Sequence, residues 1–595
     1  MKKSFVSIST LALFAGAALA ADPEFIGGGR TTEDVSTVEN TLSSGTYGNV
    51  AGGTGGTKNA AGKDSNGAVN GDVILNLENT TIKGWIIAGN TANDSFDAEG
   101  NDYLKGISDK NVLNFNDGTV LDNTEKTTNV AGLRGGLSGA YTHATVGSIE
   151  LNLNGGEMKN SFVLAAGGNG SANILGDVVV NANGTNIQGR SYTDRTGNIA
   201  IVGVQGCLDP ADPIYGYNAD DRGDSMSSYI GGRIKGALRI NVSAGEINGN
   251  IWGAYADSRI DGGTHITLSG GVVNGDVNLG VAEYNAYVGA SSISLTNNAV
   301  VNGTIYGQMK ADSRAKERYM ESATLNIGTE SNAYNGSTIK VADFQKIGVV
   351  NGSVEISSYT QAAEGTLITV SEKGKLAMSL NSESQFSNTS IENAGELSFK
   401  RGKLADNASV ALKSYNGDGT VSAFGGTFAD GVFTAGKSAS FDSSAITVGT
   451  NANDVQSVKL GDKLALDFNV AGLGEAALTV NEVKVSTDRD GIEGNVLAAF
   501  DVDLTDNGND YSVVFSAYVG AIEDASKLVA WHKGKDGVWA KLDTAIDYAD
   551  EIASIVVDGF SSYAFSQVPE PAEWAAIFGA VALALAAYSR RATRK

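Results

Sequence analysis

A short pattern, an apolar residue followed by a polar residue and then Gly, returns along this chain at a nearly constant spacing. It occurs as Ile247-Asn248-Gly249, Val273-Asn274-Gly275 and Val301-Asn302-Gly303, whose starting points are separated by 26 and 28 residues. Less regular copies start at Ile82, Met158 and Ile187. A fixed period of this length is typical of repeat architectures, in which neighbouring units stack on one another. The repeat therefore constrains the fold more strongly than any other feature.

Each repeat contains three short segments in which apolar and polar residues alternate. The first segment is represented by Val73–Leu77, Ile149–Leu153 and Leu238–Val242, the second is the apolar–polar–Gly step, and the third is represented by Asn250–Ala254. Alternation with a period of two places one set of side chains inward and the other outward. Gly and Asn supply positive φ where the chain bends. The sequence therefore predicts one coil of a parallel β-helix (β-solenoid) for each repeat, with a continuous apolar column inside.

The same pattern predicts an all-β protein made of successive regions. We expect an N-terminal segment or cap at residues 21–44 and the parallel β-helix at 45–442. From residue 443 onward Gly becomes less frequent and the alternating segments lengthen, as in Lys463–Val470 and Asp510–Tyr518. Several strands of this length within a short region are typical of an antiparallel sandwich. We therefore predict a small β-sandwich-like domain at 443–567.

The N-terminus has the pattern of an export signal at residues 1–20. Lys2 and Lys3 precede the apolar stretch Leu11–Leu19. The small residues around the expected cleavage point are Ala18, Ala20 and Ala21. This order of charge, apolar stretch and small residues is typical of secretory signal peptides. The sequence therefore predicts an exported protein.

The composition of the chain disfavours some binding partners and some kinds of catalytic or metal site. The chain has 43 Lys and Arg against 67 Asp and Glu, a net charge of −24, which disfavours binding to nucleic acid. Its single cysteine, Cys207, excludes an intrachain disulfide. The three histidines, His143, His265 and His532, fall in different units, so the sequence predicts neither a histidine-based zinc site nor a Ser-His-Asp triad. No cofactor is expected.

The last 28 residues, 568–595, have three parts in a fixed order. Val568, Pro569, Glu570 and Pro571 precede the apolar run Trp574–Tyr588, and a basic cluster that includes Arg590 and Arg591 follows. This arrangement resembles the PEP-CTERM protein-sorting domain of Gram-negative bacteria. The resemblance implies a single C-terminal hydrophobic helix that anchors the protein transiently in the inner membrane. It also implies recognition of the Pro-Glu-Pro motif by an exosortase, which removes the helix.

One group of charged residues recurs in successive repeats. "ADSR" occurs at Ala256–Arg259 and again at Ala311–Arg314, with Glu283 in the repeat between them. Stacking of the repeats would bring Asp257, Glu283 and Asp312 into one column, beside Arg259 and Arg314. Like charges at this spacing repel, so the column needs compensation. Neutralisation by the arginines is the leading interpretation, with Ca²⁺ binding and a carboxylate-based glycan-cleaving site as the alternatives.

Taken as a whole, the sequence predicts an exported, non-catalytic surface or matrix protein with a structural or adhesin-like function. The repeat body resembles the passenger stalks of autotransporter adhesins. We expect its location to be the cell surface, the outer membrane or the extracellular matrix, with exosortase as a processing partner and exopolysaccharide or other surface glycans as ligands. The alternative is a β-helix protein that binds or degrades polysaccharide. A glycan-binding protein would present aromatic side chains such as Trp252 and Tyr306 on its outer face.

Overall fold

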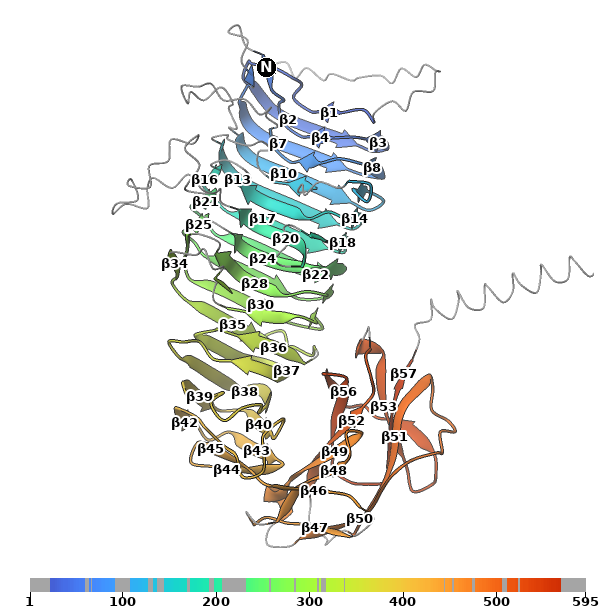
Figure 1. Ribbon diagram of the computed structural model, residues 1–595. Helices are drawn as coiled ribbons and strands as arrows, with labels where there is room; N and C mark the ends of the chain where they lie inside the picture. The colour runs from blue at the N-terminus through green and yellow to red at the C-terminus, as the bar shows by residue number, and fades with distance from the viewer. Residues whose placement is uncertain are drawn as a thin grey trace, which may run out of the picture.

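The computed structural model describes residues 22–58, 64–65, 67–90, 108–126, 132–135, 144–167, 172–191, 197–205, 232–255, 258–282, 285–307, 310–311, 317–336, 338–442, 445–451, 454–473, 477–505, 511–522 and 525–568. The described chain is all-β, and most of its strands lie in large, mainly parallel sheets. Its two helical elements are the short 3-10 turns η4 (Val470–Leu473) and η5 (Ala525–Lys527). Figure 1 shows the parallel strands stacked in chain order, a β-helix-like arrangement.

The first parallel ladder contains the alternating segments at the start of each repeat. Its strands are β2 (Val35–Leu42), β7 (Val69–Leu77), β10 (Ser108–Asn116), β13 (Ala144–Asn154), β17 (Val178–Asn183), β22 (Leu238–Ala244), β26 (Thr264–Leu268), β30 (Ser291–Leu295) and β35 (Ala323–Ile327). The ladder continues into the long strands β37 (Lys346–Thr360) and β38 (Thr366–Ser379). Leu75, Leu113 and Leu151 lie opposite one another and are fully buried.

The second ladder is an eight-stranded parallel sheet that contains the apolar residue of the repeated motif. Its strands are β3 (Gly45–Tyr47), β8 (Thr80–Ile82), β11 (Val120–Asp122), β14 (Glu157–Lys159), β18 (Asn186–Gln188), β23 (Glu246–Asn248), β27 (Val272–Val273) and β31 (Val300–Val301). The motif residues Ile82, Met158, Ile187, Ile247, Val273 and Val301 occupy one register line and are all buried. The sequence alignment of these copies is therefore confirmed.

The third ladder completes each repeat. Its strands are β1 (Phe25–Ile26), β4 (Val50–Ala51), β9 (Ile86–Ile87), β12 (Leu133–Arg134), β15 (Val163–Gly167), β20 (Asn198–Gln205), β24 (Asn250–Tyr255), β28 (Val277–Ala282), β32 (Thr304–Tyr306) and β36 (Ile339–Ala342). Ile251, Val277 and Ile305 lie in register and are fully buried. The inward residues of all three ladders form one continuous apolar core.

The stack begins earlier in the chain than the sequence predicts. The strands β1 and β2 already pair in parallel with β4 and β7, although both lie within the segment 21–44 that was expected to precede the coils. A register shift between Ser36 and Val38 interrupts the alternation of β2, which explains why the repeat is not visible there.

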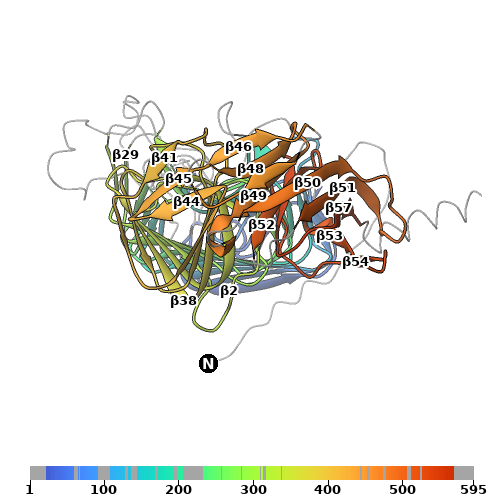
Figure 2. The same cartoon turned by 90° about the horizontal axis from the view of Figure 1, so that it is seen from below.

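Antiparallel strands close the other end of the stack. The ladders end with β39 (Thr389–Asn393), β40 (Glu396–Lys400), β42 (Ser414–Asn416) and β43 (Thr420–Phe424). The sheet formed by β41 (Ser409–Ala411), β44 (Gly426–Ala429) and β45 (Val432–Ala435) follows, and Figure 2 shows it lying across this end. The Phe428 ring stacks on Phe399 with ring centroids 4.9 Å apart, and the Phe433 ring lies 6.3 Å from Phe399. We refer to β41, β44 and β45 as the end cap.

The C-terminal strands form two mainly antiparallel layers around a second apolar core. One layer contains β46 (Lys437–Ser440), β48 (Val455–Leu460), β49 (Leu464–Asn469), β52 (Ser512–Tyr518), β56 (Ile552–Val557) and β55 (Asp547–Ala549). The other contains β47 (Ile446–Val448), β50 (Leu478–Val485), β51 (Asn495–Thr505), β57 (Ser562–Gln567), β53 (Leu528–Lys533) and β54 (Trp539–Lys541). The strands β43 and β49 are joined by an antiparallel bridge between Phe424 and Asn469.

Candidate functional site

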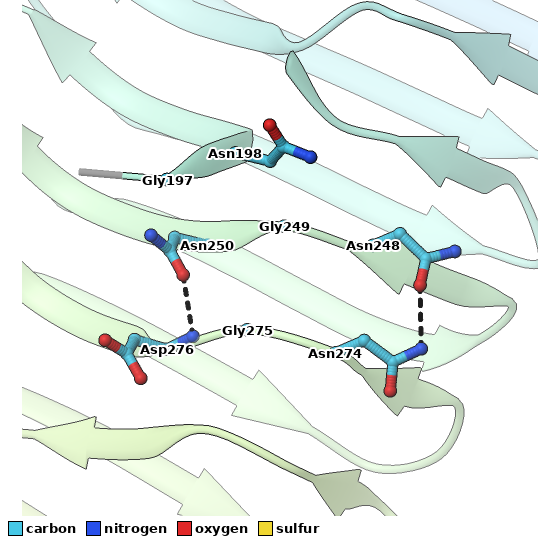
Figure 3. A pocket seen from close by; sticks show the side chains of 8 residues that line it. All are labelled: Gly197, Asn198, Asn248, Gly249, Asn250, Asn274, Gly275 and Asp276. Carbon is cyan, nitrogen blue, oxygen red and sulfur yellow. Dashed lines mark hydrogen bonds between the residues drawn. The ribbon is translucent and has the colours of Figure 1, made fainter. Parts of the chain in front are cut away.

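The corners between the second and third ladders form a polar strip on the outside of the stack. Asn248-Gly249-Asn250 lies directly above Asn274-Gly275-Asp276, and Gly197-Asn198 lies above both (Figure 3). These residues line a shallow hollow. We refer to them as the corner strip.

Close packing between coils explains the glycines of this strip. A Cβ atom on Gly275 would lie 2.4 Å from the carbonyl oxygen of Gly249, and one on Gly303 would lie 2.3 Å from that of Gly275. Positive φ occurs at Gly249 (150°) and at Asn160 (46°), but Gly275 and Gly303 do not have it. The prediction that corner residues supply positive φ therefore holds at Gly249 and Asn160 but not at Gly275 and Gly303, where the constraint is the distance to the neighbouring coil.

Hydrogen bonds connect the corner residues from one coil to the next. The Asn274 amide donates to Asn248 Oδ1 at 2.7 Å, and the Asn302 amide donates to Asn274 Oδ1 at 2.6 Å. On the other side of the glycines, Asn250 Oδ1 accepts from the Asp276 backbone N–H at 2.8 Å. Asp276 Oδ1 accepts from the Thr304 backbone N–H, also at 2.8 Å. The motif Asn is therefore a bonding element between coils as well as a corner residue.

A second row of amides follows the outward positions of the first ladder. The Asn114 amide donates to Asn76, that of Asn152 to Asn114, that of Asn181 to Asn152 and that of Asn241 to Asn181, at 2.7 to 2.9 Å. We refer to this row as the amide ladder. Each amide can donate to one neighbour while it accepts from the other, so an uncharged ladder extends without repulsion. Sequence reasoning placed these residues outward but missed the ladder, although Asn recurs in "LNL" of β7 and β13 and in "INV" of β22.

The chemistry that the corner strip offers is hydrogen bonding. Its polar side chains are the amides Asn198, Asn248, Asn250 and Asn274, together with the Asp276 carboxylate. Within the described ranges, no group of three or more His, Cys, Asp or Glu side chains is arranged to hold a metal ion. An arrangement of this kind suits a ligand rich in hydroxyl groups, since amides both donate and accept hydrogen bonds.

The expected acidic column can be placed only in part. Asp257, Glu283, Asp312 and Arg314 lie outside the described residues. Arg259 lies in β25 (Ser258–Ile260), where its Nε is 2.6 Å from Asp261 Oδ1. The Arg259 guanidinium also lies 4.9 Å from the centroid of the Tyr287 ring. Because Asp261 is not part of the expected column, its pairing with Arg259 tests neither neutralisation of the column by arginine nor calcium binding.

The expected targeting residues lie at the limits of the described chain. Ala18, Ala20 and Ala21 fall outside it, as do Pro569, Glu570, Pro571, Arg590, Arg591 and the expected C-terminal helix. Val568 is described, and its backbone N–H donates to the Lys527 carbonyl at 3.0 Å. The Pro-Glu-Pro motif therefore begins one residue after a side chain that packs against a buried cluster around Trp531 and Trp539. Among the described residues, no helix has the length and apolar character needed to cross a membrane.

Outward side chains of the third ladder are less exposed than alternation alone suggests. Trp252, which a glycan-binding protein would present on its outer face, is 2% exposed and stacks on Tyr255 with ring centroids 5.0 Å apart. Asn278, which alternates with the buried Val277, is 3% exposed and lies in register between Trp252 and Tyr306. His532 lies in β53, in the C-terminal layers, and its Nε2 is 2.8 Å from Ser561 Oγ. The outer face of the third ladder is thus more apolar than simple alternation predicts.

His265 occupies the half-exposed position expected from alternation. Its Nδ1 lies 2.9 Å from Ser292 Oγ and its Nε2 lies 3.2 Å from the Gly262 carbonyl oxygen. Burial and the nearby Arg239 lower the pKa of His265, since both disfavour the charged ring. His265 is therefore a ladder residue with hydrogen-bond partners. His143 and Cys207 lie outside the described residues.

Comparison with protein-family models, with curated proteins and with solved structures finds no match to this chain. The features that bear on function are therefore the stack, its polar surface and the sequence motifs.

Proposed function

We propose that this chain is an exported, non-catalytic structural rod of the cell surface or extracellular matrix, with adhesin-like presentation of its outer faces. In this proposal the stacked ladders form a parallel β-solenoid, and the C-terminal layers form a β-sandwich-like module beside it. The PEP-CTERM-like tail directs exosortase processing. The observation that carries the proposal is the in-register pairing of the three ladders along the stack, with amides at the outer positions.

Several properties support a structural function. The apolar core is continuous through the repeats, so each coil stabilises its neighbours. The corner residues that recur most regularly form hydrogen bonds from one coil to the next. A net charge of −24 keeps an extended surface protein soluble and limits association with polyanions.

The decisive experiment combines fractionation, electron microscopy and mass spectrometry of the protein expressed with its native ends. We expect elongated particles in the surface or extracellular fraction and a mature chain that lacks Trp574–Lys595. Replacing Pro569 and Pro571 with Ala should leave an unprocessed, membrane-retained form. An intact tail on the surface protein would contradict the sorting proposal, and globular particles would contradict the rod.

A second candidate function is glycan binding at the corner strip. The hollow beside Asn198, Asn250 and Asp276 favours it, because amides and one carboxylate face the same shallow surface (Figure 3). Asn198→Ala should weaken binding of neutral oligosaccharides about tenfold, the loss expected for about 1.4 kcal/mol. Asn116→Ala, in the first ladder, is the matched control and should leave binding unchanged. Release of sugar products by the purified protein would instead favour the polysaccharide-degrading alternative.

A further inference from the structure

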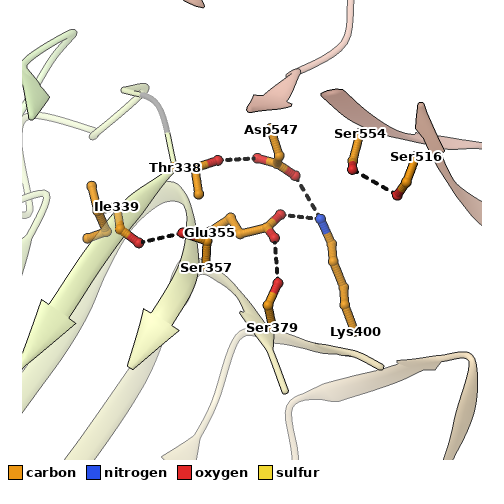
Figure 4. A network of polar contacts seen from close by, with 9 residues as sticks. All are labelled: Thr338, Ile339, Glu355, Ser357, Ser379, Lys400, Ser516, Asp547 and Ser554. Atoms are coloured by element: carbon orange, nitrogen blue, oxygen red, sulfur yellow. Dashed lines mark hydrogen bonds and ion pairs between the residues drawn. The ribbon is translucent and has the colours of Figure 1, made fainter. Parts of the chain in front are cut away.

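Three ionisable side chains meet between the stack and the C-terminal layers. Lys400 ends β40, Glu355 lies within β37, and Asp547 begins β55 (Figure 4). Lys400 Nζ lies 2.7 Å from Asp547 Oδ2 and also forms an ion pair with Glu355 Oε2. Glu355 and Asp547 therefore contact the same ammonium group, and each carboxyl group affects the pKa of the other. We refer to these residues as the junction triad.

Flanking hydroxyl groups hold the two carboxyl groups in place. Ser379 Oγ donates to Glu355 Oε1 at 2.9 Å, and Thr338 Oγ1 donates to Asp547 Oδ1 at 3.2 Å. The side chains of Lys400 and Glu355 are each 7% exposed, and that of Asp547 is 24% exposed. The triad is therefore ordered and largely shielded from water.

The charges of the triad do not balance when all three groups are ionised. Burial raises the pKa of Glu355 to about 8, although Lys400 acts in the opposite direction. Burial also acts to raise the pKa of Asp547, but Lys400 outweighs it and the pKa falls below its usual value. For Lys400, burial acts to lower the pKa, and the two carboxyl groups outweigh burial and raise it. Burial thus favours protonation of Glu355 beside the ion pair of Lys400 and Asp547.

We propose that Lys400 and Asp547 condense into an intramolecular amide, with Glu355 as the catalytic acid and base. The bond would join the stack covalently to the C-terminal layers. It forms between residues that are 147 positions apart in the chain.

The proposed reaction begins with a proton transfer inside the triad. Moving one proton from the Lys400 ammonium to the Asp547 carboxylate gives a neutral amine and a neutral carboxylic acid, with the total number of protons unchanged. The neutral pair carries no charge that needs solvation, so burial by itself favours this transfer, against the ion pairing that raises the pKa of Lys400 and lowers that of Asp547. The contact of 2.7 Å between the two groups provides the path for this transfer.

The amine then attacks the Asp547 carboxyl carbon. The electron pair of Nζ forms the new C–N bond while the Glu355 acid donates a hydrogen bond to the Asp547 carbonyl oxygen. Glu355 next relays a proton from the nitrogen to the departing hydroxyl group, so the C–O bond breaks and one water molecule leaves. The product is a secondary amide, and no oxidant or second reactant is required. Fixed positions and exclusion of water are the two conditions that favour such a condensation.

The positions of the two carboxyl groups distinguish the acceptor from the catalyst. Glu355 contacts the Lys400 ammonium that also binds Asp547, and burial favours the protonated form of Glu355 that the relay needs. Asp547 comes from the C-terminal layers, and its Oδ1 is already held by Thr338. A bond to Asp547 therefore leaves Glu355 free to exchange protons, whereas a bond to Glu355 would consume the catalyst.

A neighbouring ion pair provides a matched control. Lys403 Nζ lies 3.2 Å from Asp550 Oδ2, and these residues are also 147 positions apart. Their side chains are 73% and 61% exposed. This pair connects the same two regions but is open to water, so it should not condense.

The experiment is mass spectrometry of the folded wild-type protein and of peptides from its digest. We expect a peptide in which the Lys400 segment is linked to the Asp547 segment with the loss of one water molecule, and no such link between Lys403 and Asp550. Lys400→Met and Glu355→Gln should each restore the mass expected from the sequence. Circular dichroism will verify that each variant is folded.

Three outcomes would overturn the proposal. The first is a folded wild-type protein that contains only the unlinked peptides after prolonged incubation at neutral pH. The second is a link that maps to Glu355. The third is a complete Lys400–Asp547 link in Glu355→Gln, which would remove the assigned catalytic role. Mapping of the peptides is needed because water loss at another Asp residue would give the same intact mass.

Discussion

At the scale of single residues, the fold depends on the difference in burial between adjacent positions of a strand. In β26, Ile266 is 1% exposed and belongs to the apolar core, whereas the next residue, Thr267, is half-buried on the outer face. Burying an apolar side chain of this size contributes about 1.5–3 kcal/mol relative to leaving it in water. The alternation therefore gives neighbouring residues very different tolerance to substitution.

Replacing Ile266 with Asp should destabilise the fold by about 3–5 kcal/mol, because it places an uncompensated charge in the apolar core. Thr267→Asp, one residue further on, is the matched control and should change the unfolding free energy by less than about 1 kcal/mol. Chemical denaturation of the two variants measures the difference. Similar losses at both positions would contradict the assigned faces of β26.

The amide ladder gives a second prediction at this scale. Asn152 accepts from Asn181 and donates to Asn114, whereas Asn241 has one amide neighbour in the ladder, Asn181. Asn152→Ala should therefore cost about 1 kcal/mol and Asn241→Ala about half of that, since hydrogen bonds of this kind contribute modestly. Thermal unfolding of both variants provides the comparison. A larger loss from Asn241→Ala would show that the ladder does not contribute as described.

The sequence predicted the direction of most side chains but could not predict their outer partners. A period of two identifies Asn152 as outward without saying that the next coil places Asn181 beside it. Asn278 shows the opposite difficulty, because its register neighbours Trp252 and Tyr306 determine its burial. The junction triad was equally hidden, since Glu355, Lys400 and Asp547 are far apart in the chain and belong to no local motif.

At the scale of elements, the corners set how closely successive strands can stack. The repeated glycine was easy to find in the sequence. Positive φ, however, is not the reason for glycine at Gly275 and Gly303. Neither the close approach of a neighbouring carbonyl nor the absence of positive φ is visible in a sequence pattern. What the pattern showed was that successive repeats place Gly at the same position of the corner.

Gly275→Ala should destabilise by about 1–3 kcal/mol, because its Cβ would lie 2.4 Å from the backbone oxygen of Gly249 and the coils would have to separate. Gly559→Ala is the control, since no atom lies within 4 Å of a Cβ there. Removing a glycine at an unstrained position should leave stability unchanged or raise it by up to about 1 kcal/mol. Equal losses at both glycines would indicate a general effect of replacing glycine and not a clash between coils.

The contacts that Asp406, in the loop between β40 and β41, makes with Arg401 and with Ser438 of β46 should make the protein sensitive to acid. Burial acts to raise the pKa of Asp406, but hydrogen bonds from Arg401 and Ser438 outweigh it and lower the pKa to about 2. A depressed carboxyl pKa contributes stability above its unfolded value, near 3.8, and that stability is lost as the pH falls towards 2. The Asp406 side chain is 38% exposed, so solvent screening limits the contribution to about 1 kcal/mol.

Asp406→Asn should therefore lower stability at neutral pH and flatten the loss of stability between about pH 4 and pH 2. Denaturation curves over this range measure the slope. Glu364→Gln is the control, because Glu364 is an exposed carboxyl group in the loop between β37 and β38. The assignment would be wrong if Asp406→Asn and the wild-type protein had the same slope.

At the scale of the whole molecule, a stacked array must terminate without exposing its apolar core. The end cap meets this need at one end, because Phe428 and Phe433 pack against Phe399 in the last coil. Repeat arrays generally require terminal units of this kind to stay soluble. The sequence predicted the change of texture near residue 443 but not the cap before it, since "SVA" and "VFTA" resemble further coil segments.

The cap can be tested by shortening the chain at two points. A chain that ends at residue 442 keeps β41, β44 and β45, whereas a chain that ends at residue 424 loses β44 and β45. Both shortened chains lose Asp547 and the C-terminal layers, except that the longer chain keeps β46, so they differ in the cap and in the short segment with β46 that follows it. We expect the first to show a β-type circular dichroism spectrum with cooperative melting, and the second to aggregate because the end of its apolar core faces water. Light scattering and thermal unfolding distinguish the two.

Equal solubility and stability would show that the end of the stack needs no cap, while unfolding of both chains would show that the C-terminal layers are required for the stack to fold.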